Sequence, residues 1–415
     1  MNTRPLRRAL GTLATAATFL TASTLAPSLA SADADADPPI SSAAPGIDAF
    51  YTPPSPLPLG NPGDLIRVEK TTVSLIPGLV LLGVNAWRIM YRSTDAQDQP
   101  IAATGTLLVP ITPWLFGYRP LVDYAVGSHG SGQQCTPSIQ FHQGVQFELG
   151  VITNYLNQGW AVVIPDYQRL PVHTYANAKT TAQVTLDAAR AATKIPGSGI
   201  SAQNPLAISG YSQGGHAAAA AAERHPTYAP ELNLKGVAAG GVPADLRAVA
   251  NAVDGGFLFG VVPMAIASLK AAYPYLLLDA FNDTGKAAFA DVATQCIPET
   301  TSTWAMHHFT ELTVGGETFD ELLAARPEYA EVVDAQTVGY LKPSVPVLTY
   351  AGLFDPWVPA AVTEDLHDAW CAQGANVSFQ LYPIAEHFGA LGEGIPQVLS
   401  WLSARFAGLP APSGC

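Results

Sequence analysis

Short apolar runs of strand length alternate with longer amphipathic stretches of helix length along most of the chain. The strand-like runs are Asn85–Ser93, Ile101–Val109, Leu121–Val126, Trp160–Pro165, Leu206–Ser209, Lys235–Gly240, Val345–Ala351 and Val377–Pro383. The helix-length stretches are Ser138–Gln158, Thr180–Ile195, Gln213–Arg224, Val362–Gln373 and Ile395–Phe406. Alternation of this kind is typical of a parallel sheet with helices on both faces. The pattern therefore predicts an α/β fold with a mostly parallel central sheet.

This alternation stops over residues 246–343, which are mostly helical in character and rich in apolar groups. The strand and helix pattern resumes beyond that segment, so we interpret the segment as an insertion that lies over the sheet. Most of its apolar side chains are expected to be buried core residues. The sheet and its helices would then be built in two parts, from residues 49–245 and 344–415.

The first residues are expected to be cleaved from the mature protein. Three arginines within the first eight positions precede a weakly polar run from Ala9 to about Leu25, and small residues at 30–32 supply a cleavage pattern. We interpret residues 1–32 as a secretory signal peptide and residues 33–48 as a flexible tail. A retained membrane anchor is the alternative, but the run is interrupted by threonines and is too short for a span of ~20 residues. The paired arginines leave general and twin-arginine export both open.

The composition excludes several classes of protein. Charged residues make up only 13% of the 415 residues, whereas apolar residues make up 48%, and a typical charged share is about 25%. A disordered chain and a coiled coil are therefore excluded. The formal net charge is −13, so phosphate backbones would be repelled and no nucleic-acid partner is expected. Cleavage after residue 32 removes three positive charges and no negative one, which brings the charge to −16.

The four cysteines bear on the cellular compartment. They are Cys135, Cys296, Cys371 and Cys415. In an exported protein they favour two disulfides, in one of three possible pairings, and four free buried thiols are the alternative. No Cys-x-x-Cys pair occurs in the sequence, so neither a zinc site nor a thioredoxin-type redox site is expected. We expect no metal and no organic cofactor.

One pentapeptide carries the strongest chemical signal. Gly210–Gly214 reads Gly-Tyr-Ser-Gln-Gly, the single match to G-x-S-x-G in the chain. It follows an apolar strand and opens an alanine-rich helix, which is the setting of a nucleophile elbow. The flanking glycines let the turn tighten and hold the Ser212 hydroxyl clear of the sheet. Ser212 is therefore predicted to be a nucleophile; a glycine-rich turn with an exposed serine is the alternative.

A nucleophilic serine needs a base, and the base needs an orienting acid. Of the six histidines that follow Ser212, only His387 comes directly after a late strand. Asp355 follows the strand Val345–Ala351, so both side chains would lie at the carboxyl edge of the sheet, together with Ser212. His387 is predicted to be the base and Asp355 its orienting acid. Glu386 is the alternative acid, with poorer geometry because it shares the loop of the histidine.

The oxyanion of an acyl-transfer transition state needs hydrogen-bond donors fixed in advance. One is expected to be the backbone amide of Gln213, the residue after the nucleophile. The second should come from the glycine-rich loop 127–132, which follows a strand. Gly130 is our first choice and His129 our second. His129 is not expected to bind a metal, because no carboxylate or histidine is suitably spaced to join it.

Several segments together resemble the secretory lipase family of actinobacteria and yeasts, of the lipase A type. They are Phe50–Pro54, Pro62–Asp64, Cys135–Ser138, Ala161–Tyr167, Gly210–Ala217, and Asp355 with Val358 and Pro359. These segments span nearly the whole of the expected mature chain. The resemblance implies an α/β-hydrolase core, a large helical cap over residues 246–343, and a catalytic triad of Ser212, Asp355 and His387.

The resemblance also implies the disulfide pairings Cys135–Cys296 and Cys371–Cys415. One departure affects the oxyanion hole. Yeast members of the family carry an acidic side chain in the oxyanion loop, whereas this loop has glycine and serine around His129. The donors here would then be backbone amides only.

The sequence therefore predicts a secreted carboxylic ester hydrolase that cleaves fatty acyl esters through an acyl-serine intermediate, as triacylglycerol lipases do. Its expected partners are a lipid or ester substrate and, transiently, a lipid interface, and we expect a monomer outside the cell or in the cell envelope. A short-chain carboxylesterase or a peptidase of the same fold is an alternative. A catalytically silent lipid-binding envelope protein is another.

Overall fold

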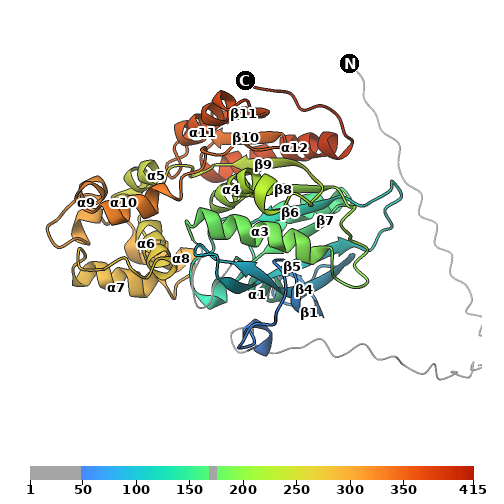
Figure 1. Cartoon of the computed structure of the whole chain (residues 1–415), viewed down its shortest axis with the longest axis horizontal. Coiled ribbons are helices and arrows are strands. Elements are labelled where there is room, and N and C mark those ends of the chain that lie inside the picture. Colours follow the sequence, from blue (N-terminus) through green and yellow to red (C-terminus); the bar gives the residue numbers. More distant parts are fainter. Residues whose placement is uncertain (1–47, 168–174) are drawn as a thin grey trace, which may run out of the picture. The chain divides into compact units, whose positions relative to one another are not determined.

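The computed structural model describes residues 48–167 and 175–415 (Figure 1). A nine-stranded sheet runs in the order β1-β4-β5-β7-β6-β8-β9-β10-β11. Its strands are β1 (Leu65–Thr71), β4 (Val84–Thr94), β5 (Pro100–Pro110), β6 (Leu121–Ala125), β7 (Ala161–Pro165), β8 (Leu206–Tyr211), β9 (Leu234–Gly240), β10 (Val347–Gly352) and β11 (Val377–Tyr382). The strands from β7 to β11 in that order pair in parallel, whereas β1, β4 and β5 pair antiparallel. The predicted mostly parallel sheet is confirmed.

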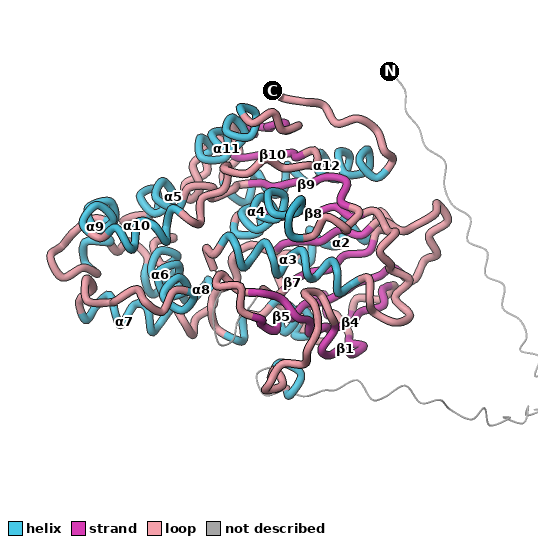
Figure 2. Tube along the Cα trace, viewed as in Figure 1, coloured by secondary structure: helices cyan, strands magenta, loops and turns pink. Residues whose placement is uncertain are grey.

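Helices cover both faces of this sheet, as the alternation predicted. They are α1 (Pro137–Gln143), α2 (Leu149–Asn157), α3 (Ala178–Ala192), α4 (Gln213–Tyr228), α11 (Ala360–Ala372) and α12 (His387–Phe406), with short 3-10 turns at Ala49–Tyr51, Gln133–Cys135 and Phe309–Glu311. α3 and α4 pack against each other on one face, and α2 and α12 pack on the other (Figures 1 and 2). The alanines of α4 are almost all buried, which lets this helix lie close to the strands. Among the described residues, no helix combines the length and apolar character that crossing a membrane requires.

Two helix predictions differ from the structure. The stretch expected to be one helix, Ser138–Gln158, is divided into α1 and α2, because Gly144 ends α1 in the left-handed conformation with φ of 73°. The last helix begins at His387, eight residues before the predicted start. Glu386 allows this early start, since its carboxylate accepts the amides of Phe388 and Gly389 as an N-cap.

Three strands near the N-terminal side were not predicted. β1 is an edge strand in which Lys70 is exposed and every other residue is half-buried, so its sequence lacks the apolar pattern of the inner strands. β2 (Ser74–Ile76) and β3 (Leu79–Val80) form a separate two-stranded sheet. The predicted signal peptide and nearly all of the predicted tail lie outside the described residues.

Six helices follow β9 and precede β10, within the segment interpreted as an insertion. They are α5 (Leu246–Val253), α6 (Val261–Ala272), α7 (Asp283–Val292), α8 (Ile297–Trp304), α9 (Phe319–Ala325) and α10 (Pro327–Asp334). Buried side chains of these helices and of the loops between them, among them Phe259, Phe281 and Leu312 in the loops, form a hydrophobic core separate from that of the sheet. Figure 1 shows α6–α10 gathered to one side of the sheet.

Two disulfides join distant parts of the chain, in the pairings that the family resemblance implied. Cys135–Cys296 connects the segment before α1 to the start of α8, across 161 positions of sequence. Cys371–Cys415 connects the end of α11 to the last residue. The first of these bonds anchors the inserted helices to the sheet.

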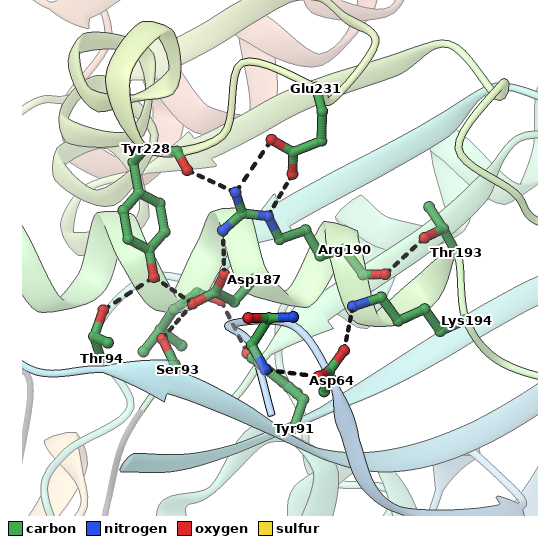
Figure 3. A network of polar contacts seen from close by, with 12 residues as sticks. Asp64, Tyr91, Ser93, Thr94, Asp187, Arg190, Thr193, Lys194, Tyr228 and Glu231 are labelled. Atoms are coloured by element: carbon green, nitrogen blue, oxygen red, sulfur yellow. Dashed lines mark hydrogen bonds and ion pairs between the residues drawn. The ribbon is translucent and has the colours of Figure 1, made fainter. Parts of the chain in front are cut away.

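A buried polar network joins β4, α3 and α4 away from the G-x-S-x-G turn (Figure 3). The Asp187 carboxylate on α3 accepts hydrogen bonds from Ser93 Oγ at 2.7 Å, Tyr228 Oη at 2.8 Å and Arg190 Nη1 at 2.8 Å. Arg190 also donates to Glu231 at 2.6 Å. Burial raises the pKa of Asp187 to about 6, whereas these hydrogen bonds act in the opposite direction. A buried carboxylate without such partners would destabilise the fold, so the network fixes how α3 sits on the sheet.

Candidate active site

Ser212 lies in the sharp turn between β8 and α4, at the carboxyl edge of the sheet. Its φ and ψ are 59° and −122°, a strained conformation for a residue with a side chain. The Ser212 amide donates to the Gly240 carbonyl at 2.9 Å, which ties the turn to the neighbouring strand β9. This is the strand–turn–helix geometry of a nucleophile elbow, which exposes the serine hydroxyl above the sheet.

Glycines are required around Ser212 because other backbone atoms occupy the space of a side chain. A Cβ at Gly210 would lie 2.2 Å from the Gly214 carbonyl oxygen, and a Cβ at Gly214 would lie 1.9 Å from the Ala125 carbonyl oxygen. A Cβ at Gly215 would lie 2.2 Å from the Gly240 carbonyl oxygen. Helix α4 therefore begins in direct backbone contact with the ends of β6 and β9.

Asp355 and His387 meet beside this turn, although they come from different loops. Asp355 follows β10, and its Oδ2 lies 2.5 Å from Nδ1 of His387, the first residue of α12. Oδ1 of Asp355 accepts the backbone amides of Trp357 at 2.9 Å and Val358 at 3.0 Å. Both side chains are buried, at 7% and 4% exposure. Since the carboxylate accepts from Nδ1–H, the lone pair of the imidazole is left on Nε2.

Glu386 does not orient His387. Its two carboxylate oxygens accept the amides of Phe388 at 3.0 Å and Gly389 at 2.6 Å, which caps α12. The carboxylate of Glu386 is used in this helix cap. Asp355 is therefore the one of the two candidate acids that hydrogen-bonds the imidazole of His387.

Two cavities meet at Ser212. The first has a volume of about 840 Å³, and its lining includes Ser212, Gln213 and a large set of apolar side chains from the inserted helices. Among those are Val249, Val253, Val262, Ile266, Leu269 and Phe319. The second has a volume of about 820 Å³ and is lined by both Ser212 and His387. The structure thus brings the predicted nucleophile and base to one cavity wall, with Asp355 behind the base.

His216 also lines the first cavity, but its position does not suit a base. Its Nε2 lies 2.8 Å from the Gln336 carbonyl oxygen, and burial lowers its pKa. Among the described residues, no carboxylate hydrogen-bonds His216. It therefore connects α4 to the segment after α10.

The loop after β6 is held rigidly next to Ser212. The Gly127 amide donates to Oε1 of the buried Glu148 at 2.8 Å, and His129 Nδ1–H donates to the Gly127 carbonyl at 2.9 Å. Tyr167 donates to the Val126 carbonyl at 2.8 Å. Burial raises the pKa of Glu148 to about 7. These contacts fix the backbone that runs past the serine.

The residues of this loop differ in whether they line the two cavities. Gly130 forms an antiparallel bridge with Cys296, beside the disulfide, and is not among the residues that line either cavity in the described chain. Ser128 lines both cavities. Tyr175 lines the first cavity together with Ser128, and burial raises the pKa of Tyr175 to about 12. His129 is directed instead into a stack on Phe147, with ring centroids 4.4 Å apart.

Sequence reasoning missed Ser128 and Glu148. Glu148 carried a usable signal, since a single carboxylate in the apolar stretch 145–152 suggests a buried partner. Ser128 carried none, because every residue of a glycine-rich loop is an equal candidate before the loop is placed.

Residues 137–414 match the sequence model of secretory lipases. The chain belongs to the secretory lipase family. Lipase 10 of Candida albicans is 31% identical over 392 residues, an alignment that covers 89% of this chain and 83% of that lipase. A Mycobacterium tuberculosis protein named as a probable inactive lipase is 29% identical, with coverage of 88% and 83%. Because a relative of this chain carries that name, the residues of the site must decide whether this chain is active.

The fold has a counterpart among solved structures. Candida antarctica lipase A in its closed state superposes with a TM-score of 0.78, covering 90% of this chain and 89% of that one, at 24% identity. The likeness covers about nine-tenths of both chains and shows a shared α/β-hydrolase fold.

Proposed function

We propose that this secretory lipase family member is an active serine hydrolase that cleaves fatty acyl esters. One observation carries the proposal: Ser212 in its strained turn and His387 line the same cavity, and Asp355 Oδ2 lies 2.5 Å from His387 Nδ1. Nucleophile, base and orienting acid come from three separate loops at one edge of the sheet. This arrangement supports a Ser-His-Asp triad.

The reaction proceeds in two steps. Ser212 Oγ attacks the ester carbonyl while Nε2 of His387 takes its proton, and collapse of the tetrahedral intermediate transfers that proton to the leaving alcohol. Water then attacks the acyl-serine with His387 again as base, which releases the fatty acid and returns the proton to Ser212. Asp355 holds the imidazole in the Nδ1–H tautomer throughout and stabilises the imidazolium.

The oxyanion is bound by two backbone amides. The Gln213 amide is the first N–H of α4 and follows the nucleophile directly, so it also benefits from the positive end of the helix dipole. For the second donor we assign Ser128 in place of Gly130, because Ser128 lines both cavities and the Gly127 amide already donates to Glu148. Each donor would contribute a factor of about 10²–10³ to kcat.

The inserted helices bind the acyl chain. We assign residues 246–343 as a cap, because its helices supply most of the apolar lining of the 840 Å³ cavity next to Ser212. A wall of Val, Leu, Ile and Phe side chains offers no partner for a peptide backbone or a charged acid. This lining supports a fatty acyl ester as substrate, over a peptide.

The remaining parts of the chain are consistent with export. Family membership and the two disulfides support secretion, with residues 1–32 as the signal peptide that is removed. The protein would then act as a monomer outside the cytoplasm.

A fluorophosphonate probe tests whether the site is active. The wild type should be labelled and Ser212→Ala should not, while both unfold at the same temperature. An unlabelled wild type would show that this chain is catalytically silent and would end the proposal.

Initial rates on p-nitrophenyl esters from acetate to palmitate, and on emulsified triglyceride, then test the substrate class. We expect the highest rates on medium or long chains. Activity confined to acetate and butyrate would support a short-chain carboxylesterase instead.

A further inference from the structure

The turn formed by β2, β3 and the residues after them exposes an unusual number of apolar side chains. Ile76, Leu79 and Leu82 are 58%, 52% and 84% exposed. From Thr71 to Trp87 the chain contains no charged residue. Single exposed leucines are ordinary on protein surfaces, but a contiguous uncharged set marks an interaction site.

This hairpin is held firmly against the body of the protein. Val73 at its base is buried, and the Leu81 amide donates to the Val73 carbonyl at 2.6 Å. The end of α1 touches its other side, since a Cβ at Gly144 would lie 2.3 Å from the carbonyl carbon of Ile76. The exposed side chains therefore stand on a fixed support.

The apolar surface continues from the hairpin to the catalytic cavity. A groove of about 680 Å³ next to the hairpin is lined by Leu75, Val145 and Phe147. Phe147 is 57% exposed and also lines the cavity that holds Ser212 and His387. We call Ile76, Leu79, Leu82, Val145 and Phe147 together the hairpin surface.

Two further exposed phenylalanines border the same cavity. Phe257 from the segment before α6 is 58% exposed, and Phe388 from the start of α12 is 56% exposed. Large aromatic side chains are seldom left in water at the edge of a site without a partner. The cavity with the catalytic residues is thus lined by three exposed phenylalanines, one of which, Phe147, belongs to the hairpin surface.

We propose that the hairpin surface docks on an uncharged lipid surface, such as an acylglycerol droplet, and holds the catalytic cavity against it. The inference rests on the proposed function, because fatty acyl esters of glycerol are concentrated at such a surface. The charge of the protein indicates which kind of lipid surface it would bind. The hairpin has no cation to attract anionic headgroups, and the negative net charge, −13 for the full sequence and −16 without residues 1–32, opposes them, whereas a neutral acylglycerol surface is not repelled. Burial of the exposed leucines and phenylalanines supplies the binding free energy.

The test compares two double variants of exposed residues. Leu79→Asp/Leu82→Asp places two charges in the hairpin surface. Leu115→Asp/Phe116→Asp is the matched control, since both residues are 82% exposed and precede β6, at the edge of the sheet opposite Ser212. The measurements are flotation with triolein droplets, the rate on that emulsion, and the rate on p-nitrophenyl butyrate below its solubility limit.

We expect the hairpin variant to lose at least about tenfold in droplet-bound fraction and in emulsion rate. Its kcat/KM on dissolved p-nitrophenyl butyrate should stay within about twofold of the wild type, as should every measurement on the control variant. Equal flotation of the hairpin variant and the wild type would overturn the proposal. So would a wild-type dimer that the hairpin variant turns into a monomer with its emulsion rate unchanged, because the surface would then be a self-association interface.

Flotation measures the binding of the protein to droplets independently of catalysis. If the wild type floated with triolein but hydrolysed no dissolved ester, the proposed function would fail while the docking surface stood. If it hydrolysed the dissolved ester but did not float, the docking surface would fail alone.

Discussion

Oδ2 of Asp355 lies 2.5 Å from Nδ1 of His387, and its Oδ1 is already occupied by two backbone amides. The carboxylate is therefore fixed from both sides before it meets the imidazole. Because its position is set by the backbone after β10, the imidazole is held in one tautomer with its lone pair on Nε2, as the proposed role of base requires. A change in the loop after β10 that moved Asp355 would therefore also change the tautomer of His387.

Replacement of Asp355 by Asn should remove this tautomer control. The Asn amide can keep the two backbone hydrogen bonds through Oδ1, but its NH2 group would face Nδ1 and favour the Nε2–H tautomer, which cannot accept a proton from Ser212. We expect kcat on p-nitrophenyl octanoate to fall by about 10⁴-fold at unchanged fold. Circular dichroism and the unfolding temperature check the fold, and a loss below tenfold would mean that another group orients His387.

Gly214 should tolerate no side chain, because its backbone lies directly against that of Ala125. A Cβ there would lie 1.9 Å from the Ala125 carbonyl oxygen, so Gly214→Ala should push α4 away from β6 and move Ser212. We expect a loss of several kcal/mol in unfolding free energy together with loss of fluorophosphonate labelling, measured in urea. Gly150→Ala is the matched control: it lies in α2 with no atom near its Cβ position, and should stabilise by up to about 1 kcal/mol. Equal stability of the two variants would contradict the prediction.

Glu148 should make stability depend on pH. Burial raises the pKa of Glu148 to about 7 from an ordinary value of 4.5. Between these two pH values the folded protein keeps a proton that the unfolded chain has lost, so this residue makes stability fall as pH rises from 4.5 through 7. Glu148→Gln cannot ionise and keeps an acceptor for the Gly127 amide. The unfolding temperature of the wild type relative to this variant should therefore decline across that window and level off above it.

A difference in unfolding temperature between wild type and Glu148→Gln that is constant from pH 4.5 to 7 would count against this assignment. The dependence on pH, rather than the size of the destabilisation, is what separates titration of Glu148 from a simple loss of packing.

Phe319 should limit the length of the acyl chain. It stands in the wall between the 840 Å³ cavity and a second apolar cavity of about 390 Å³ within the cap, a wall that it shares with Ile266, Leu269 and Val333. Phe319→Ala would join the two cavities. We expect the ratio of rates on p-nitrophenyl palmitate and octanoate to rise by about tenfold.

Truncation of a buried phenylalanine also costs about 3–5 kcal/mol of stability, so a matched variant is needed. Phe289→Ala removes the same atoms from the core of the cap, and Phe289 lines neither cavity. The Phe289→Ala variant should lose a comparable free energy of unfolding and leave the ratio of rates on p-nitrophenyl palmitate and octanoate unchanged. If the ratio of rates on palmitate and octanoate rose equally in both variants, loosening of the cap rather than the joined cavity would be the cause of the changed chain-length preference.

Much of this architecture follows from local sequence pattern. Inner strands such as β7 and β8 are recognisable because both faces are covered, which makes them continuous apolar runs. The single G-x-S-x-G motif is likewise a local pattern. Asp355 and His387 were found because each follows a strand that is recognisable from its own sequence. Edge strand β1 was not recognisable, because half-burial removes the contrast between its faces.

The sequence by itself thus determined the sheet, the elbow and the candidate triad, since strand periodicity and turn chemistry act over a few residues. Tertiary structure decided which groups converge. Gly130 is bridged to Cys296, Ser128 lines the two cavities that Ser212 lines, and Phe147 lines both the external groove and the catalytic cavity. These relationships depend on contacts between distant segments, such as Gly130 and Cys296, which are 166 positions apart. No local pattern encodes such contacts, because packing of distant segments selects them.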